Sequence, residues 1–167
     1  MDRFERLAGA LRRIPGLEVR ENEPMKRHTT FRIGGPARLM ALPRSRKEAA
    51  AAVRAATEVG IAPFFLGNGS NLLVADHGYE GFVLKACGLD QVREVNCRLR
   101  AESGITLARL ANAALGRGLT GLEFAHGIPG TLGGAVVMNA GAYGGEMVQV
   151  LTAVTYLDGA GEEHTLP

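Results

Sequence analysis

The chain has 167 residues, of which 46% are hydrophobic and 22% charged, a composition typical of a globular protein with its own core. No apolar run reaches membrane-spanning length, and charged residues interrupt the N-terminal segment "MDRFERLAGALRR" where a signal peptide would be apolar. We therefore expect no membrane partner and a cytoplasmic location. Cys87 and Cys97 are too few for a disulfide framework or a metal site, and we expect buried or inert thiols.

The net charge of +2 is unevenly distributed, because residues 1–47 hold 12 of the 19 Lys and Arg but only 5 of the 17 Asp and Glu. A nucleic-acid-binding segment would interleave its basic residues with aromatics or place them on one helix face. Here the arginines are scattered, with Phe31 as the nearby aromatic residue. We expect a solvated surface and no nucleic-acid partner, although a basic half could help to attract an anionic small molecule.

The first half of the chain has a strand–helix–strand pattern. Periodicity, capping residues and turns predict an amphipathic helix over 2–13, a strand over 37–43, a helix from the capping box "SRKE" (45–48) to Gly60, a buried strand over 61–66 and a strand over 81–86. This order favours parallel pairing with a right-handed crossover. We therefore predict a small α/β lobe over residues 1–87.

The pattern changes near residue 88. The predicted elements are two half-exposed antiparallel strands in "QVREVNCRLRAES" (91–103), a helix over 105–116 that buries Leu107, Leu110, Ala111, Ala114 and Leu115, a glycine-dense tract over 118–145, and two strands around a turn in 150–166. We predict a second, α+β lobe over 88–167. The chain stops just after a predicted strand, so we expect this lobe to be incomplete, as in part of a longer protein or an unusually short version.

Two glycine-rich stretches are candidates for ligand binding. "GNGSNLLV" (67–74) directly follows a strand, and it suits either a tight turn or a loop whose backbone lies against an anion. In "GLEFAHGIPGTLGGAVVMNAGAYGGE" (121–146), glycines permit positive φ and close approach of a bulky ligand. Its segment 131–139 could form a short helix with free N–H groups facing an anion or a ring edge. Neither stretch is a Rossmann fingerprint or a Walker A motif, and alone each fits a plain loop.

Three segments together are more specific: "NEPMKRHTTFRIGGPA" (22–37), "FFLGNGSNLLV" (64–74) and "GIPGTLGGAVVMNAGAYGGE" (127–146). In this order and spacing they resemble the UDP-N-acetylenolpyruvoylglucosamine reductase (UDP-N-acetylmuramate dehydrogenase) family, flavoenzymes of bacterial peptidoglycan synthesis. The resemblance runs from about residue 20 to the end. It implies an α+β, two-lobed fold of the vanillyl-alcohol oxidase type, with an extended FAD held between a small α/β lobe and an α+β lobe.

The resemblance also implies which residues hold the FAD. Residues 67–71 match the loop around the pyrophosphate, where successive N–H groups suit an anion, and they include no His or Cys for covalent attachment. Residues 127–141 match the tract along the flavin, where donors would stabilise the reduced ring. For Arg32, a structural ion pair is an equally good explanation. The residues assigned to FAD are Arg32, Gly67, Asn68, Gly69, Ser70, Asn71, Gly127, Ile128, Pro129, Gly130, Thr131, Gly133, Gly134, Asn139, Ala140 and Gly141.

The reaction implied by the resemblance has two halves. NADPH reduces the FAD, and hydride then passes to the enolpyruvyl double bond of a UDP-sugar while a protein acid protonates the adjacent carbon. The family's catalytic arginine lies in a Tyr-Arg-x-Ser motif beyond the point where this chain ends, and its serine and glutamate lie further on. We therefore assign no catalytic residue, and the alternative is an inactive FAD- or nucleotide-binding module. A different oxidase on the same fold is a third, less favoured reading.

Other candidate residues indicate no site. Ser70 lacks the elbow motif and placed acid of a hydrolase. The histidines lack ligand spacing, and a surface or capping role is expected for each of His28, His77, His126 and His164. Tyr143 could contact flavin or substrate, or could simply pack. A missing third domain would leave apolar surface bare, so we expect that the chain can self-associate.

Overall fold

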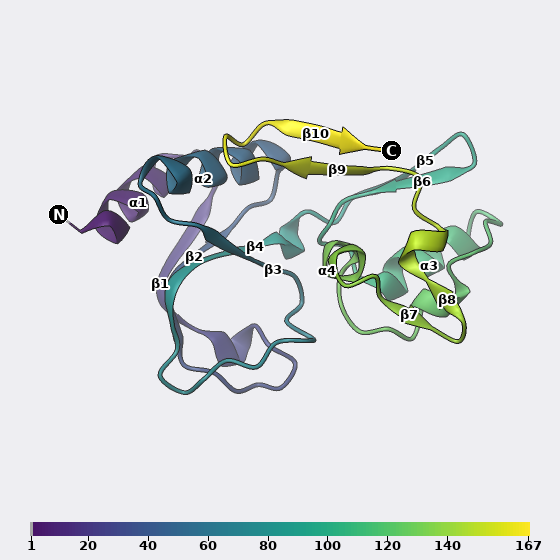
Figure 1. The fold of residues 1–167 in the computed structure, drawn as a ribbon, viewed down its shortest axis with the longest axis horizontal. Coiled ribbons are helices and arrows are strands. Elements are labelled where there is room, and N and C mark those ends of the chain that lie inside the picture. Colours follow the sequence, from purple (N-terminus) through teal and green to yellow (C-terminus); the bar gives the residue numbers. More distant parts are fainter. Residues whose placement is uncertain (1) are drawn as a thin grey trace.

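The main sheet has four strands, β1 (Glu18–Pro24), β2 (Pro36–Leu42), β3 (Pro63–Leu66) and β4 (Tyr79–Lys85), in the order β1–β2–β4–β3. β1 is antiparallel to β2, whereas β2 and β3 both run parallel to β4. The computed structural model describes residues 2–167 (Figure 1). Its helices are α1 (Arg3–Leu11), α2 (Arg46–Glu58), α3 (Leu107–Leu115) and α4 (Leu132–Val137), with 3-10 turns η1 (Met25–Arg27), η2 (Ala86–Gly88), η3 (Glu123–Ala125) and η4 (Met147–Gln149). Its other strands are β5 (Val92–Val95), β6 (Arg98–Ala101), β7 (Gly141–Ala142), β8 (Gly145–Glu146), β9 (Val154–Leu157) and β10 (Glu163–Leu166).

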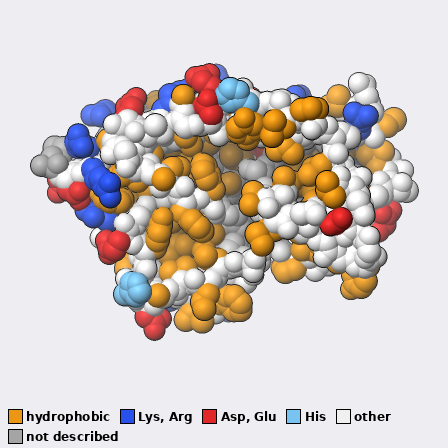
Figure 2. Space-filling view, in the orientation of Figure 1, with side chains coloured by type: hydrophobic (Ala, Val, Ile, Leu, Met, Phe, Trp, Pro, Cys, Tyr) orange, Lys and Arg blue, Asp and Glu red, His pale blue; other side chains and the backbone are white. Residues whose placement is uncertain are grey.

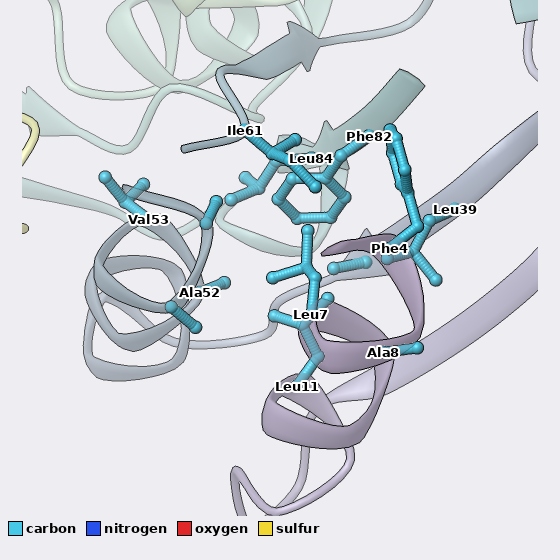
Figure 3. Close-up of a cluster of buried hydrophobic side chains, with 13 residues drawn as sticks. Phe4, Leu7, Ala8, Leu11, Leu39, Ala52, Val53, Ile61, Phe82 and Leu84 are labelled. Carbon is cyan, nitrogen blue, oxygen red and sulfur yellow. The ribbon is translucent and has the colours of Figure 1, made fainter. Parts of the chain in front are cut away.

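Helices cover one face of this sheet and loops cover the other. Side chains alternate along a strand, so Phe82 and Leu84 of β4 meet α1 and α2, while Val83 between them points to the opposite face. Figure 3 shows Leu7 of α1 directed toward Phe82 and Leu84. On the opposite face, Val83 packs with residues of loops and turns, among them Met25, and no helix of the described residues joins that cluster. The loop-covered face therefore carries the segments 22–37 and 64–74.

The predicted parallel strand–helix–strand unit is confirmed, with β4 inserted between β2 and β3. α2 begins as predicted, since Ser45 caps it by accepting a hydrogen bond from the Glu48 N–H at 3.2 Å. It also ends as predicted, with Gly60 at a φ of +68° directly after the C-cap.

Two features of this sheet differ from expectation: one strand was not predicted, and another is exposed where burial was predicted. β1 was not predicted, because "EVRENEP" is mostly polar and Val19 is its one aliphatic residue; as an edge strand it needs no apolar alternation. The segment 61–66 was expected to be buried, but β3 is the other edge strand. Phe64 is 38% exposed and Phe65 58% exposed, because the sheet has no neighbour beyond β3 among the described residues.

The second half of the chain contains the predicted hairpins and helix. β5 and β6 pair antiparallel around Asn96 and Cys97, whose φ values of 50° and 58° are those of a type I′ turn. α3 buries four of its five predicted residues, but Leu115 is 76% exposed. Leu115 lies about 80° around the helix from Leu107, beyond the edge of the packed face.

The last hairpin, β9–β10, returns to the first half of the chain. Figure 1 shows it running beside α2. Arg46 Nη1 donates to Glu163 Oε1 at 3.1 Å, and Arg54 Nη1 donates to Glu162 Oε1 at 3.5 Å. Gly161 lies so close to α2 that an added Cβ would come 2.5 Å from the Ala50 carbonyl oxygen. The division into lobes at residue 88 stays a prediction. Within residues 2–167 no helix combines the length and the apolarity needed to cross a membrane.

Candidate functional site

The three motifs singled out in the sequence meet at the loop 67–71, which follows β3. The Thr30 N–H donates to the Gly69 carbonyl oxygen at 3.2 Å, which ties the loop to the segment 22–37. The Ser70 hydroxyl donates to the Pro129 carbonyl oxygen at 3.1 Å, which ties it to the segment 127–146. Segments about 40 and 60 residues away on the two sides of the loop are therefore in direct contact with it.

Close packing explains the glycines in this loop. Gly69 has a φ of +65°, and a Cβ there would lie 2.2 Å from the His28 carbonyl oxygen. A Cβ on Gly67 would lie 2.1 Å from Oγ1 of Thr131, which is buried. Gly130 has a φ of +132°, and its Cβ would lie 2.9 Å from Ser70 Oγ. No other residue type fits these positions without displacing a neighbour.

Gly121 and Gly144 of the tract also have positive φ, but three other glycines singled out in it do not. Gly127, Gly133 and Gly134 have ordinary backbone conformations. Gly133 allows close packing, since an added Cβ would lie 2.8 Å from the Cβ of Ser103. Gly127 faces open space, with no atom of the described residues within 4 Å of an added Cβ.

The loop presents backbone donors. Within residues 2–167, the N–H groups of Asn68, Gly69, Ser70 and Asn71 make no hydrogen bond to another protein atom. Consecutive donors of this kind form a concave surface suited to an anion. Figure 2 shows a hollow near the middle of the pictured face, with hydrophobic side chains on both sides of it.

The short helix α4 is confirmed, but most of its first N–H groups are not free as expected. The Leu132 N–H donates to the Ile105 carbonyl oxygen at 2.8 Å, and the Gly133 N–H donates to that of Ser103 at 2.8 Å. These bonds join α4 to the chain before α3. The helix N-terminus is therefore used mainly to hold the second half together.

The predicted residues after α4 form a small turn. The Asn139 amide donates from Nδ2 to Glu146 Oε2 at 2.8 Å, and its Oδ1 accepts from the Val148 N–H at 2.9 Å. Gly141 begins β7, which pairs with β8 in the same turn. Tyr143 is 97% exposed with a φ of 54°, so the alternative of a packing role is wrong.

Two of the predicted residues contribute their side chains to a core. Ile128 and Ala140 pack against the cluster built around Leu107, Phe124 and Met147. For a ligand, these two residues therefore offer mainly backbone groups.

Arg32 lies in the tight turn after η1. Its φ is 55°, and its N–H donates to the Thr29 carbonyl oxygen at 3.2 Å. The structural ion pair considered for this residue is not found among residues 2–167. Contact with the cofactor stays a prediction.

His28 was expected at the surface or as a cap, and that expectation is wrong. It is 7% exposed, with Nε2 at 2.9 Å from Glu23 Oε1 and Nδ1 at 2.8 Å from Lys85 Nζ. Burial lowers the pKa of His28 below its ordinary value of 6.5, against the opposing effect of Glu23. The sequence offers little indication of this network, because Glu23 belongs to a polar run and Lys85 ends an apolar strand.

The cysteines are unpaired: Cys97 is exposed and Cys87 is half-buried. Of the two expected alternatives, a buried or an inert thiol, burial does not apply to Cys97. Burial raises the pKa of the Cys87 thiol. Residues 2–167 contain no group of three His, Cys, Asp or Glu side chains placed to hold a metal ion.

A family model described as "FAD binding domain" matches residues 37–167. The chain belongs to the FAD-binding domain family. It is 53% identical over 137 residues to the UDP-N-acetylenolpyruvoylglucosamine reductase of Caldanaerobacter subterraneus subsp. tengcongensis, covering 82% of this chain and 45% of that protein. It is 46% identical over 160 residues to the reductase of Moorella thermoacetica, covering 96% of this chain and 53% of that protein. The resemblance that the three motifs indicated is thereby confirmed.

Comparison with solved structures supports the same resemblance. The UDP-N-acetylenolpyruvylglucosamine reductase of Thermus caldophilus matches with a TM-score of 0.71 and 34% identity, over 90% of this chain and 52% of that one. p-Cresol methylhydroxylase matches with a TM-score of 0.68 at 12% identity, over 98% of this chain and 35% of that one, which bears on the fold alone. The predicted fold class, an α+β FAD-binding fold of the vanillyl-alcohol oxidase type, is confirmed, as is FAD as the family's cofactor. The chain spans about half the length of the curated relatives it matches.

Proposed function

We propose that this chain forms the FAD-binding part of a UDP-N-acetylenolpyruvoylglucosamine reductase in the cytoplasm, and that the loop 67–71 holds the cofactor's pyrophosphate. One observation carries the proposal. The loop 67–71 is in direct contact with both other motifs, through Thr30 on one side and Pro129 on the other.

The chemistry of the loop suits a diphosphate. Its donors are backbone N–H groups, supplemented by the side-chain amides of Asn68 and Asn71, whereas the Ser70 hydroxyl is engaged with the Pro129 carbonyl oxygen. The loop contains no acidic residue that would repel an anion. Gly67 and Gly69 keep the loop close to its neighbours, so the donors are held in place before a ligand arrives. A preformed set of donors loses little conformational entropy on binding.

The tract 127–141 is proposed to run along the rest of the cofactor. Open space beside Gly127 leaves room for a ring at that position. FAD, when bound, would supply the hydride chemistry of the reductase, with NADPH as reductant and an enolpyruvyl UDP-sugar as substrate. The residues of this chain would bind and orient the cofactor, and we assign no proton donor among them.

The visible spectrum of the purified protein tests cofactor binding. We expect flavin absorption bands that co-elute with the protein in gel filtration, either as purified or after reconstitution with FAD. A folded preparation that stays colourless after incubation with FAD would refute the proposal.

The alternative is FAD binding without turnover, which is favoured by the chain's spanning about half the length of its relatives. Adding NADPH and then UDP-N-acetylglucosamine enolpyruvate distinguishes the two. Bleaching of the flavin followed by substrate-dependent reoxidation supports a working reductase. FAD retention without these steps supports a binding module.

A further inference from the structure

A buried polar network lies directly behind the loop 67–71. It joins Glu23 at the end of β1, His28 just after η1 and Lys85 at the end of β4. Arg20 Nη1 also donates to Glu23 Oε1, at 3.0 Å. Glu23 and His28 are both 7% exposed, so this network is shielded from solvent at its centre.

The partners of His28 determine where its proton lies. A lysine ammonium can only donate, so Nδ1 of His28 accepts from Lys85 at 2.8 Å. Nε2 therefore carries the proton and donates it to Glu23 at 2.9 Å. This arrangement requires a neutral imidazole, because a second proton on Nδ1 would point at the ammonium.

His28 is in direct contact with the loop through its backbone. Its carbonyl oxygen is the atom that a Cβ on Gly69 would meet at 2.2 Å. Two residues later, the Thr30 N–H holds the Gly69 carbonyl oxygen at 3.2 Å. Because the backbones at His28 and Gly69 are closely packed against each other, a shift of His28 would also displace Gly69.

We propose that neutral His28 is a positioning residue for the cofactor loop and that its protonation weakens FAD binding. The inference rests on the proposed placement of the pyrophosphate at residues 67–71. Protonation would break the bond from Lys85 and set two cations side by side, and the segment 28–30 would move away from Gly69.

The charges around His28 fix the direction of the effect. Glu23 on β1 favours the imidazolium, whereas burial, Lys85 on β4 and Arg20 on β1 oppose it and lower the pKa of His28. Arg27 of η1 lies 3.9 Å from the Glu23 carboxylate, and the half-buried thiol of Cys87 in η2 lies near Lys85. Because the pKa of His28 is below its unfolded value of 6.5, the unfolded chain takes up the proton more readily. The contribution of neutral His28 to the free energy of unfolding is therefore complete above pH 6.5 and is lost as the pH falls from 6.5 through the lower pKa of the folded protein. FAD binding weakens where the folded protein itself takes up the proton, below that lower pKa.

The test is the dissociation constant of FAD as a function of pH, from 8 to 5, followed by quenching of flavin fluorescence. We expect the constant to rise below the pKa of His28 with a slope of at most about tenfold per pH unit, the limit for one proton. His28→Gln should bind more weakly at pH 8 but lose this pH dependence. His77→Gln, at an exposed histidine outside the network, is the matched control and should retain the wild-type profile.

Two further variants make the test independent of His28→Gln. Lys85→Met removes the cation that opposes protonation, so the rise in the dissociation constant should begin at higher pH. Glu23→Gln removes the anion that favours protonation, so the rise should begin at lower pH. Wild-type FAD binding that is independent of pH, or shifts of both variants in one direction, would overturn the inference while leaving the proposed function intact. Failure of the wild-type protein to bind FAD at any pH would refute the proposed function instead, and this inference with it.

Discussion

Gly60 and Gly69 have nearly the same backbone conformation, with φ values of +68° and +65°, but different surroundings. Gly60 ends α2 and has no atom within 4 Å of an added Cβ, whereas at Gly69 such a Cβ would lie 2.2 Å from the His28 carbonyl oxygen. The two positions therefore separate the cost of a left-handed backbone from the cost of losing close contact between loops.

We predict that Gly69→Ala abolishes FAD retention, because the loop must move away from His28. Gly60→Ala is the matched control: it should lower the free energy of unfolding by about 1–2 kcal/mol, the cost of a left-handed non-glycine residue, and leave FAD content unchanged. Flavin content per folded protein and urea unfolding measure the two effects. Full flavin content in a folded Gly69→Ala protein would argue against the pyrophosphate assignment.

The candidate site was predictable as a set of segments but not as a set of contacts. Glycine spacing and the resemblance indicated residues 67–71 and 127–141, since those features are local in sequence. The reason for each glycine depends on which distant atom faces it, such as Thr131 at Gly67 or Ser103 at Gly133. The burial of His28 likewise depends on β1, a strand that its own sequence does not reveal.

In the turn of the β5–β6 hairpin, one residue type does not suit the backbone conformation of its position. Its turn residues Asn96 and Cys97 both have positive φ, 50° and 58°. The second position of such a turn favours glycine, and Asn suits the first. Cys97 therefore carries strain that another residue could relieve.

We predict that Cys97→Gly raises the free energy of unfolding by roughly 0.5 kcal/mol, because relief of about 1–2 kcal/mol of strain exceeds the ~0.5–1 kcal/mol entropic cost of glycine. Cys97→Ala removes the thiol but keeps the Cβ, so its stability should match the wild type. Thermal unfolding under reducing conditions compares all three proteins. Equal stabilisation by Ala and Gly would show that the thiol, and not the backbone, is responsible.

Elements were easier to predict than their surroundings. Capping residues located α2 and the alternating pattern located β5 and β6, because those features are set by neighbours in sequence. The exposure of β3 could not be read from "IAPFFL", since an apolar run looks the same in a central and in an edge strand. Only the insertion of β4 between β2 and β3 places β3 at the edge of the sheet.

At the scale of the whole molecule, β3 is an edge strand with apolar side chains exposed, Phe65 the more so at 58%. An unpaired, apolar strand edge is a template for pairing with a second chain. We therefore propose the β3 edge as the surface through which the chain self-associates.

We predict that the wild-type protein self-associates with increasing concentration and that Phe65→Lys suppresses this. Leu115→Lys is the matched control. Leu115 is 76% exposed but lies on the helix α3, which offers no strand edge for pairing. Sedimentation velocity of the three proteins, each loaded with FAD, measures the association. Equal suppression by both lysines would point to general hydrophobicity, and a monomeric wild type would contradict the prediction.

The β9–β10 hairpin can pack against α2 only after nearly the whole chain has been synthesised. Arg46 and its partner Glu163 are separated by 117 residues, so this contact cannot form while the chain between them is being synthesised. At ribosomal rates that interval lasts roughly 6–23 s, far longer than a helix needs to form. The surface of α2 around Ala50 is thus uncovered while most of the proposed cofactor site, residues 67–71 and 127–141, is being synthesised. A nascent chain arrested before Gly161 would present that surface to chaperones, although its four-stranded sheet was already complete.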